Sequence, residues 1–479
     1  MRCSLVLLAA LLAALPRVAP AEPAAPIEPD EFGPLIMIED IEVIGNGSTQ
    51  TDLILRALPL RAGDVLHAGD KRLRAARYQV LALGFFRDVT LGMRKGRERG
   101  QVVLEVEVVE RGTVVLNRLW FGTTDVAPYW VGADVSERNL LGLGLELGGG
   151  FIYAANGDID GSRDQWATEM RLGDASVLGS RFGLQGSATL VRGSEPYRVG
   201  GDPGEVAPRD LRAFPYRRFG GRAAVTYDIT VLSRVSAGVR VEQLVADTPL
   251  APTLTQPDGQ VAPLDLHLER GESRVVTTGL TFDRDTRPDP ILPHRGGHVV
   301  LSGELGASLL GGDYDFGLVF GRYEHYWPLL GGAHALGLKL SGGVVFGDAP
   351  RFDRIHISDV NRMLTPRALG MVLSAAAPLD ILGPLDILGP RGERSTYGDI
   401  GGSANLEYAF ELFRGSGKNR VYGGDVFVGA GLWGLGERAE LRGPSDTLSI
   451  DVYVDAGVRI DTDVGVFEVT IANALGRLR

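Results

Sequence analysis

The residue types that could do chemistry are concentrated in one segment, Asp283–Gly297, where acids, arginines and histidines follow one another closely. The acids and arginines of Asp283–Arg287 could bind a metal or a phosphate, and His294 and His298 lie four residues apart. No nearby ligand spacing accompanies the acids, and two glycines interrupt the helix that a zinc-binding histidine pair would use. We therefore interpret the acids and arginines, among them Asp283, Asp285 and Arg287, as the polar lining of a lumen at the end of a strand; Pro293 and Gly296 are further positions of the same strand motif.

No other pattern in the chain predicts catalysis. No serine lies in a Gly-x-Ser-x-Gly turn, and the only cysteine, Cys3, precedes an apolar N-terminal run that we expect to be removed. The sequon at residues 46–48 is explained by a tight turn. We expect no enzymatic activity, no metal and no cofactor, and the net charge of −11 argues against nucleic acid as a partner.

The chain that must position these residues alternates apolar and polar positions from about Gly112 to Ile471, in about fifteen short segments. In Asp451–Asp461 every second residue is apolar, and most residues between them are charged or polar. Successive side chains of a strand point to opposite faces, so each segment has one apolar and one polar face. A soluble sandwich also alternates, but a pattern sustained over about 360 residues favours a transmembrane β-barrel with a polar lumen.

The N-terminal residues predict export. Arg2, the apolar run Leu5–Leu15 and the Ala-Pro-Ala of residues 19–21 are typical of a secretory signal peptide, here residues 1–21. Residues 22–34 are rich in proline, alanine and acids, and we interpret them as a linker. No later stretch approaches the roughly 20 apolar residues that a membrane-spanning helix needs.

Residues 35–111 follow a different pattern, which predicts a small α+β domain of order β-α-α-β-β ahead of a barrel at residues 112–479. The expected elements are strands at Ile36–Ile44, Phe85–Met93 and Gln101–Val109, with helices from Ser48 or Thr49 to Leu58 and over Asp70–Leu83.

Long links alternate with short turns in the barrel segment, as the outer loops of a barrel do. The expected long links are Ala155–Arg163, Arg192–Gly220, Ala246–Glu272, Gly347–Gly402 and Gly434–Asp446. The fourth is the longest, and a loop of that length is usually functional or disordered. It contains Leu-Asp-Ile-Leu-Gly-Pro twice, at residues 379–390, which we interpret as a duplication without a role.

Four motifs resemble those of the outer-membrane barrel-assembly superfamily, the BamA/TamA type, in which periplasmic POTRA domains precede a barrel of about sixteen strands. The N-terminal segment resembles a single POTRA domain through its opening at residues 36–46 and through Leu83–Val89. Barrel motifs of the family are matched by Asn139–Gly144, Asp283–Gly297 and Gly457–Val466. The resemblance assigns motif residues Gly45, Asn46, Gly84, Phe85 and Phe86 in the POTRA domain, and Asn139, Gly142 and Gly144 near the barrel start.

The resemblance also implies a long loop that folds back into the lumen and is held by an arginine, a contact that we call the latch. Arg367 is the best match to that arginine, and acids on two inner strands are its implied partners. Glu411 matches one acid, with Glu407 as the alternative, whereas Gly429 stands where the other is expected. A lumen arginine needs carboxylates to offset its lost hydration, so we expect a weakened latch.

Matched to the family, Val464–Ala472 is the fifteenth strand, and the usual closing strand with its terminal aromatic is absent. A barrel open by one strand exposes unpaired backbone groups to lipid, which is costly. The seam would lie between this strand and the first, near Thr113–Phe121. Different pairing, closure by a partner and a truncated gene are open alternatives.

The resemblance implies a mainly β protein of the bacterial outer membrane, with its POTRA domain in the periplasm. Its expected function is to assist insertion and assembly of outer-membrane proteins, whose strands would add to the POTRA sheet edge and to the barrel seam. The expected partners are unfolded outer-membrane or secreted client proteins, other subunits of an assembly machinery, and outer-membrane lipids. A dedicated protein translocation pore and a structural, porin-like barrel are the alternatives.

Overall fold

The computed structural model describes residues 35–474 except 68–69, 125–126, 178–179, 202–206, 231, 256–258, 361–366, 374–395, 415–419 and 438–448. The expected signal peptide, linker and hexapeptide repeat lie outside the described residues. The chain divides into two compact units, the first holding residues 1–113, 137–146 and 174–181, and the second holding the remainder. In the described part of the chain, no helix is long and apolar enough to cross a membrane.

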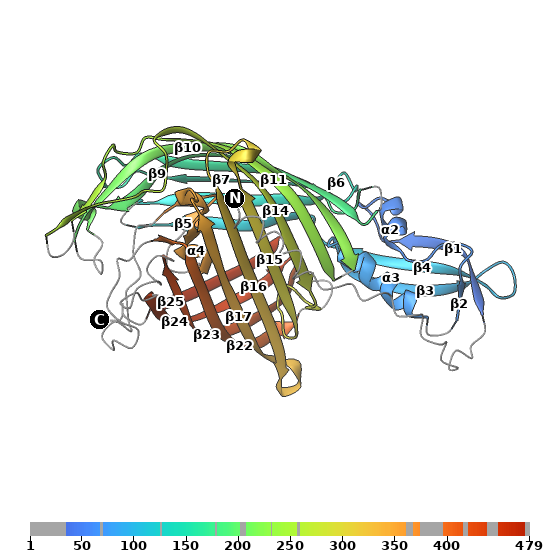
Figure 1. Ribbon diagram of the computed structural model, residues 1–479. Coiled ribbons are helices and arrows are strands. Elements are labelled where there is room, and N and C mark those ends of the chain that lie inside the picture. The colour runs from blue at the N-terminus through green and yellow to red at the C-terminus, as the bar shows by residue number, and fades with distance from the viewer. Residues whose placement is uncertain are drawn as a thin grey trace. The chain divides into compact units, whose positions relative to one another are not determined.

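The first unit is built on a four-stranded sheet of order β2-β1-β4-β3 (Figure 1). Its elements are β1 (Ile36–Ile44), α2 (Thr51–Ala57), β2 (Val65–Leu66), α3 (Lys71–Ala82), β3 (Phe86–Lys95) and β4 (Gln101–Glu110). β1 runs parallel to β4, whereas β3 is antiparallel to β4 and forms an edge of the sheet. The predicted strands and helices are confirmed to within a few residues; β2 was missed because two residues carry no periodicity.

Apolar side chains from the sheet and both helices form the core of this unit, among them Ile38, Ile54, Val80, Leu104 and Val106. Gly84 follows α3, and the buried rings of Phe85 and Phe86 behind it contact each other edge to face at 5.2 Å. Gly45 has a φ of +91°, and a Cβ there would lie 2.1 Å from the Val108 carbonyl oxygen. Only glycine fits this close approach to β4.

Side chains hold the connection from β1 to α2 by binding its backbone. Asn46 Nδ2 donates to the Thr49 carbonyl at 3.0 Å. The Glu110 carboxylate accepts the N–H of Ser48 at 3.0 Å and the N–H of Thr49 at 2.7 Å. Burial raises the pKa of Glu110, but the hydrogen bonds from Thr49 and Ser48 outweigh it and hold the pKa below its usual 4.5.

We predict that Glu110→Gln lowers the free energy of unfolding of the first unit by about 1–2 kcal/mol at neutral pH, because a neutral amide accepts these bonds more weakly. Since the folded-state pKa is lowered, the carboxylate's contribution is complete above the unfolded pKa and is lost as the pH falls through the folded one. Urea unfolding at several pH values, followed by far-ultraviolet circular dichroism of α2 and α3, measures both effects. Glu107→Gln, at an exposed site of β4, is the control; equal midpoints for Glu110→Gln and the wild type would contradict the prediction.

The second unit holds most of a fifteen-stranded antiparallel sheet, in which each strand pairs with its neighbours along the chain. The strands are β5 (Val114–Gly122), β6 (Trp130–Leu140), β7 (Leu145–Ala154), β8 (Gln165–Asp174), β9 (Phe182–Arg198), β10 (Leu211–Thr230), β11 (Ser233–Ala246), β14 (Gly271–Asp285), β15 (Gly296–Gly306), β16 (Phe316–Leu329), β17 (His334–Gly347), β22 (Ile400–Arg414), β23 (Val421–Gly436), β24 (Ser449–Thr462) and β25 (Gly465–Ala474). The sheet curls into a barrel in Figure 1. The predicted mainly β class and the count of fifteen strands are confirmed.

Small elements lie in the links between these strands. They are β12 (Thr253–Thr255), β13 (Val261–Pro263), β18 (Ile355–His356), α4 (Ile357–Val360), β19 (Arg367–Ala368), β20 (Met371–Val372) and β21 (Tyr397–Gly398), with short 3-10 turns at Pro208–Asp210, Ser308–Leu310, Leu330–Gly332 and Arg351–Asp353. Six of these described elements, from the 3-10 turn at Arg351 to β21, belong to the longest link.

The outer face of the barrel wall is apolar and the inner face is polar. On β24, Val454 and Val458 are 37% and 36% exposed, whereas Tyr453 and Arg459 are each only 7% exposed. Exposed valines alternate with buried polar and aromatic residues on β23 in the same way. The alternation predicted for Asp451–Asp461 is therefore confirmed, with the apolar side chains facing outward.

The predicted link Arg192–Gly220 is wrong in its bounds. β9 and β10 stay paired as far as Arg198 and Leu211, so the link is only residues 199–210. The glycines, prolines and arginines in this stretch suggested a loop, but those outside residues 199–210 lie in two strands of 17 and 20 residues. Composition failed here because the paired strands are longer than a membrane crossing of about 9–11 residues requires.

Candidate functional site: the barrel lumen and its seam

A group of linked polar side-chain contacts lies at the connection from β14 to β15. His298 Nε2 lies 3.2 Å from Asp283 Oδ1. Arg287 contacts Asp285 at 2.7 Å and Glu324 of β16 at 3.0 Å. The other two residues singled out from the sequence lie beside them, Pro293 in the connection and Gly296 at the first position of β15. The Asp285 and Glu324 carboxylates are thus paired with Arg287, Asp283 contacts His298, and Asp289 accepts the backbone N–H groups of Ile291 and Leu292.

The loop between β17 and β22 packs against the inner face of β9 and β10. The Phe352 ring lies 4.6 Å from the Tyr216 ring, and the Arg218 guanidinium lies 4.6 Å from the centre of the Phe352 ring. Next to it, Arg351 Nε donates to Glu195 Oε1 at 3.0 Å, and the Glu195 side chain is 1% exposed. We call the described parts of this link, residues 348–360, 367–373 and 396–399, the lumen loop.

A second ionic contact fixes the lumen loop to the barrel wall. Arg240 of β11 binds Asp353 of the loop at 2.7 Å. The same guanidinium contacts Glu304 at 2.9 Å and Glu242 at 3.1 Å. Because a buried charge without a partner is strongly destabilising, Asp353 is held in place by Arg240, whereas Arg240 itself also has the carboxylates of Glu304 and Glu242.

Arg367 does not contact either acid that the resemblance implied. Its Nη1 lies 3.9 Å from Asp359 Oδ2, and its Nη2 donates to the Phe352 carbonyl at 3.3 Å. Both partners belong to the lumen loop. The expected contact with Glu407 or Glu411 is therefore corrected: in this structure Arg367 ties the loop to itself.

The two acids have other partners. Glu407 receives two hydrogen bonds from Arg459 of β24, at 2.9 and 2.6 Å, and one from Lys339 of β17 at 2.6 Å. Glu411 binds Arg414 at 2.8 Å, near the end of β22. Glu407 does not pair with Arg367 because Arg459 and Lys339 of the barrel wall already neutralise its carboxylate.

A neighbouring strand fills the position of the second expected acid. Gly429 of β23 lies opposite Asp455 of β24. A Cβ on Gly429 would lie 2.0 Å from Asp455 Oδ1, so the carboxylate of Asp455 occupies the space that a side chain at Gly429 would take. The lumen keeps an acid at this place, although it comes from the adjacent strand.

Asn139, Gly142 and Gly144 shape the turn between β6 and β7, which lies in the first unit. The Asn139 Oδ1 accepts the N–H of Gly144 at 2.8 Å, and its Nδ2 donates to Thr49 Oγ1 at 2.9 Å. The motif residues of the first unit, Gly45, Asn46, Gly84, Phe85 and Phe86, likewise lie in turns or in the core.

The first and last strands of the sheet, β5 and β25, meet without forming a ladder. Among the described residues one backbone hydrogen bond joins the two sides, from the Leu116 N–H to the Val464 carbonyl at 2.8 Å. On its other side β25 is paired with β24 over Tyr453–Thr462. The strands that were predicted to flank the seam do flank it, and their facing edges are largely unpaired in the described part of the chain.

This chain can now be compared with known proteins. It has a barrel whose first–last seam is largely unpaired in the described residues, a loop that folds inward, and a small α+β unit earlier in the sequence. The model of the Omp85 superfamily domain matches residues 139–478. The chain belongs to the Omp85 superfamily. The outer membrane protein assembly factor BamA of Nitratidesulfovibrio vulgaris is 23% identical over 330 residues, which are 68% of this chain and 37% of that protein. The chain therefore spans a little over a third of that relative's length.

Solved structures show the same fold. BamA from Haemophilus ducreyi lacking POTRA domains 1–3 matches with a TM-score of 0.52 and 14% identity, covering 92% of this chain and 81% of that one. CdiB from Escherichia coli matches with a TM-score of 0.57 and 10% identity, covering 92% and 72%. The Omp85 fold and family support a bacterial outer-membrane location for this barrel.

Sequence reasoning missed the residues that hold the lumen loop, namely Glu195, Arg240, Arg351 and Asp353. A signal was present in the sequence. Arg240 and Glu242 alternate with the apolar residues Val239 and Val241, and charges at every second position mark the inner face of a barrel strand. Their partners on the loop could not be inferred, because pairs separated by more than a hundred residues leave no local pattern.

We predict that Arg351→Ala releases the lumen loop and speeds its cleavage by proteinase K added to intact cells by roughly tenfold or more, because it leaves Glu195 buried without its partner. Arg367→Ala should have the smaller effect, since its contacts lie within the loop. Arg420→Ala, at a side chain that is 93% exposed, is the control. Faster cleavage of Arg367→Ala than of Arg351→Ala would support the latch that the resemblance implied and would contradict this account.

Proposed function

We propose that this Omp85 protein assists insertion of other proteins into the bacterial outer membrane, with the seam between β5 and β25 as its working site. The observation that carries the proposal is the single backbone hydrogen bond across that seam in the described residues. The similar BamA of Nitratidesulfovibrio vulgaris is an outer membrane protein assembly factor, which agrees with a site built from backbone edges.

An unpaired strand edge in lipid has the chemistry that this function needs. Its N–H and C=O groups have no hydrogen-bond partners, because hydrocarbon supplies none. A strand that docks there therefore forms hydrogen bonds immediately. Backbone pairing makes few demands on side chains, so one seam can receive clients of unrelated sequence. Outer-membrane lipids would lie against the outer side of the seam, and the lumen would lie on its inner side.

The first unit is proposed to be a POTRA domain in the periplasm that receives unfolded clients before insertion. Its order β2-β1-β4-β3 leaves β3 with one unpaired edge among the described strands. That edge is ten residues long, from Phe86 to Lys95. An extended client can add to it as a fifth strand, and further subunits of an assembly machinery can use the same surface.

The lumen loop argues against the two alternative functions. A translocation pore or a porin-like channel must open a path through the lumen, and here the loop contacts the inner wall through Arg351–Glu195 and Asp353–Arg240. Clearing the path would break both buried ion pairs. Insertion at the seam leaves them intact, so the geometry favours assembly.

We predict that a disulfide across the seam stops client insertion. The Leu116–Val464 hydrogen bond brings these residues close enough for Leu116→Cys/Val464→Cys to form one. In cells that depend on the variant, oxidised protein should fail to raise the amount of folded client barrels, and reduction should restore it.

The matched control is Val426→Cys/Val458→Cys, which bridges two outward-facing residues opposite each other in the β23–β24 ladder. It should leave insertion unchanged, because those strands are already paired. Normal insertion by the oxidised seam variant would remove the seam from the mechanism.

We predict that a proline on the free side of β3 abolishes client binding. Backbone N–H groups of an antiparallel strand point alternately to each side, so Thr90→Pro and Met93→Pro, both at exposed sites, block opposite sides. One should disrupt the β3–β4 ladder, and the other should leave the unit folded but unable to crosslink to clients. Crosslinking that persists in the folded variant would rule out strand addition at β3.

A further inference from the structure

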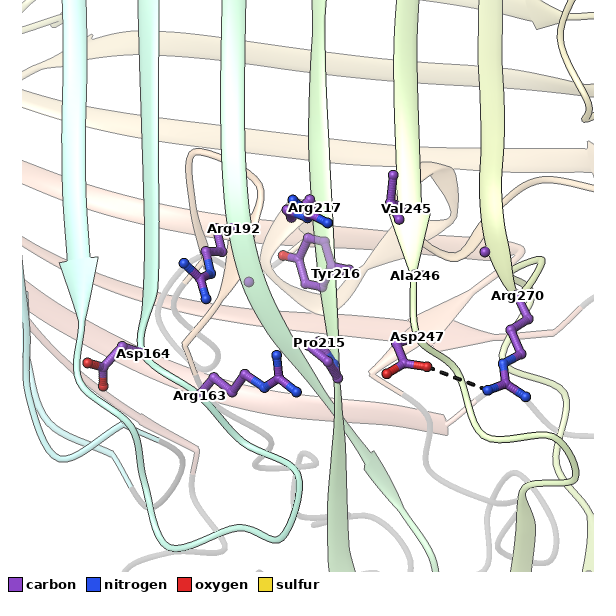
Figure 2. A pocket seen from close by; sticks show the side chains of 12 residues that line it. Arg163, Asp164, Arg192, Pro215, Tyr216, Arg217, Val245, Ala246, Asp247 and Arg270 are labelled. Carbon is purple, nitrogen blue, oxygen red and sulfur yellow. Dashed lines mark ion pairs between the residues drawn. The ribbon is translucent and has the colours of Figure 1, made fainter.

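Two arginines face each other on the outer surface of the barrel. Arg192 of β9 and Arg217 of β10 are directly opposite in the ladder. Their chain neighbours Val191 and Tyr216 are buried in the cluster that includes Phe352 of the lumen loop, so they point inward. Because successive side chains alternate, Arg192 and Arg217 point away from the lumen. Figure 2 shows both among the residues that line one pocket, together with Arg163, which comes from the link before β8.

These arginines line a cavity of about 520 Å³ that has an excess of positive charge. Four arginines border it, with two acids, Asp164 and Asp247. Asp247 contacts Arg270 at 3.7 Å, and Asp164 accepts the N–H of Asn156 at 2.9 Å.

The other three guanidiniums, those of Arg163, Arg192 and Arg217, have no ion pair within the described part of the chain. Like charges directly opposite each other on a sheet are destabilising unless an anion lies between them. The cavity therefore has the composition of an anion site.

The position along the strands indicates which anion. Leu190 lies two residues before Arg192 on β9, and Phe219 lies two residues after Arg217 on β10. These two apolar side chains are opposite each other, point outward and are exposed. Eight residues farther, next to the short turn, the rings of Phe182 and Tyr227 contact each other at 5.0 Å.

Eight residues of a strand tilted by roughly 40° span about 20 Å of membrane thickness, close to the height of an outer-membrane apolar band. The arginine pair lies just beyond that band, at the height of lipid headgroups on the side of the long loops.

We propose that Arg163, Arg192, Arg217 and Arg270 form a binding site for the phosphate groups of an anionic lipid headgroup at the outer rim of the barrel. Guanidinium groups bind phosphate through paired N–H donors, and all four cations here are arginines. The apolar residues below them, Leu190 and Phe219, would contact the acyl chains of the same lipid. The site does not depend on the seam or on client binding.

The test uses the full chain purified in neutral detergent and titrated with dioctanoyl phosphatidic acid, with bound lipid counted by native mass spectrometry. Saturable binding to the wild type is expected, with none of the matching phosphatidylcholine. Arg192→Gln/Arg217→Gln should raise the dissociation constant about tenfold or more. Arg181→Gln/Arg284→Gln removes two arginines near the opposite strand ends, and it should bind as the wild type does.

Inorganic phosphate separates a lipid site from a free-phosphate site. It should displace the lipid only at far higher concentration, because it lacks the acyl chains; displacement at equal concentration would overturn the lipid assignment. Equal lipid binding by Arg192→Gln/Arg217→Gln and the wild type would overturn the site itself. An equal loss of lipid binding in the control variant Arg181→Gln/Arg284→Gln would do the same. Heat-dependent gel mobility checks folding, and Arg192→Lys/Arg217→Lys, which keeps the charge but loses the paired donors, should bind at an intermediate level.

Discussion

Inside a membrane, each backbone N–H and C=O group needs a partner from the protein, because hydrocarbon offers none. Fourteen of the fifteen strand-to-strand junctions around this barrel meet that need as ladders, and the junction of β5 with β25 does not in the described residues. The function proposed for the chain depends on this single exception. The same edges that would be costly in lipid are the edges that a client strand can satisfy.

Charges inside the wall explain why such a barrel keeps its shape. Arg240 and Arg459 each contact more than one carboxylate, and together they connect six strands and the lumen loop. Buried ion pairs of this kind add little net stability, but breaking one is costly, so they fix one arrangement of the lumen. A rigid lumen leaves the seam as the part of the barrel that can open. The loop is held by Arg351 and Asp353, and the self-contact of Arg367 stabilises its fold.

Local rules predicted most of the fold. Alternation at residues 451–461 assigned inner and outer faces correctly, and Gly84 and Asp70 marked the ends of α3. The rules failed where pairing overrides composition, as in β9 and β10, whose glycines and prolines suggested a loop. The lumen contacts were not predictable, because Arg351 meets Glu195 across 156 residues, and because Arg459 had taken the acid assigned to Arg367.

The most direct test of the account is depletion of this protein followed by quantitative proteomics of the outer-membrane fraction. The account predicts that many unrelated β-barrel proteins decline together, because a seam that recognises backbone edges does not select one client. Loss of a single secreted or surface protein would point to a dedicated translocator. An unchanged outer-membrane proteome, in cells without a second protein of this type, would contradict assembly as the function.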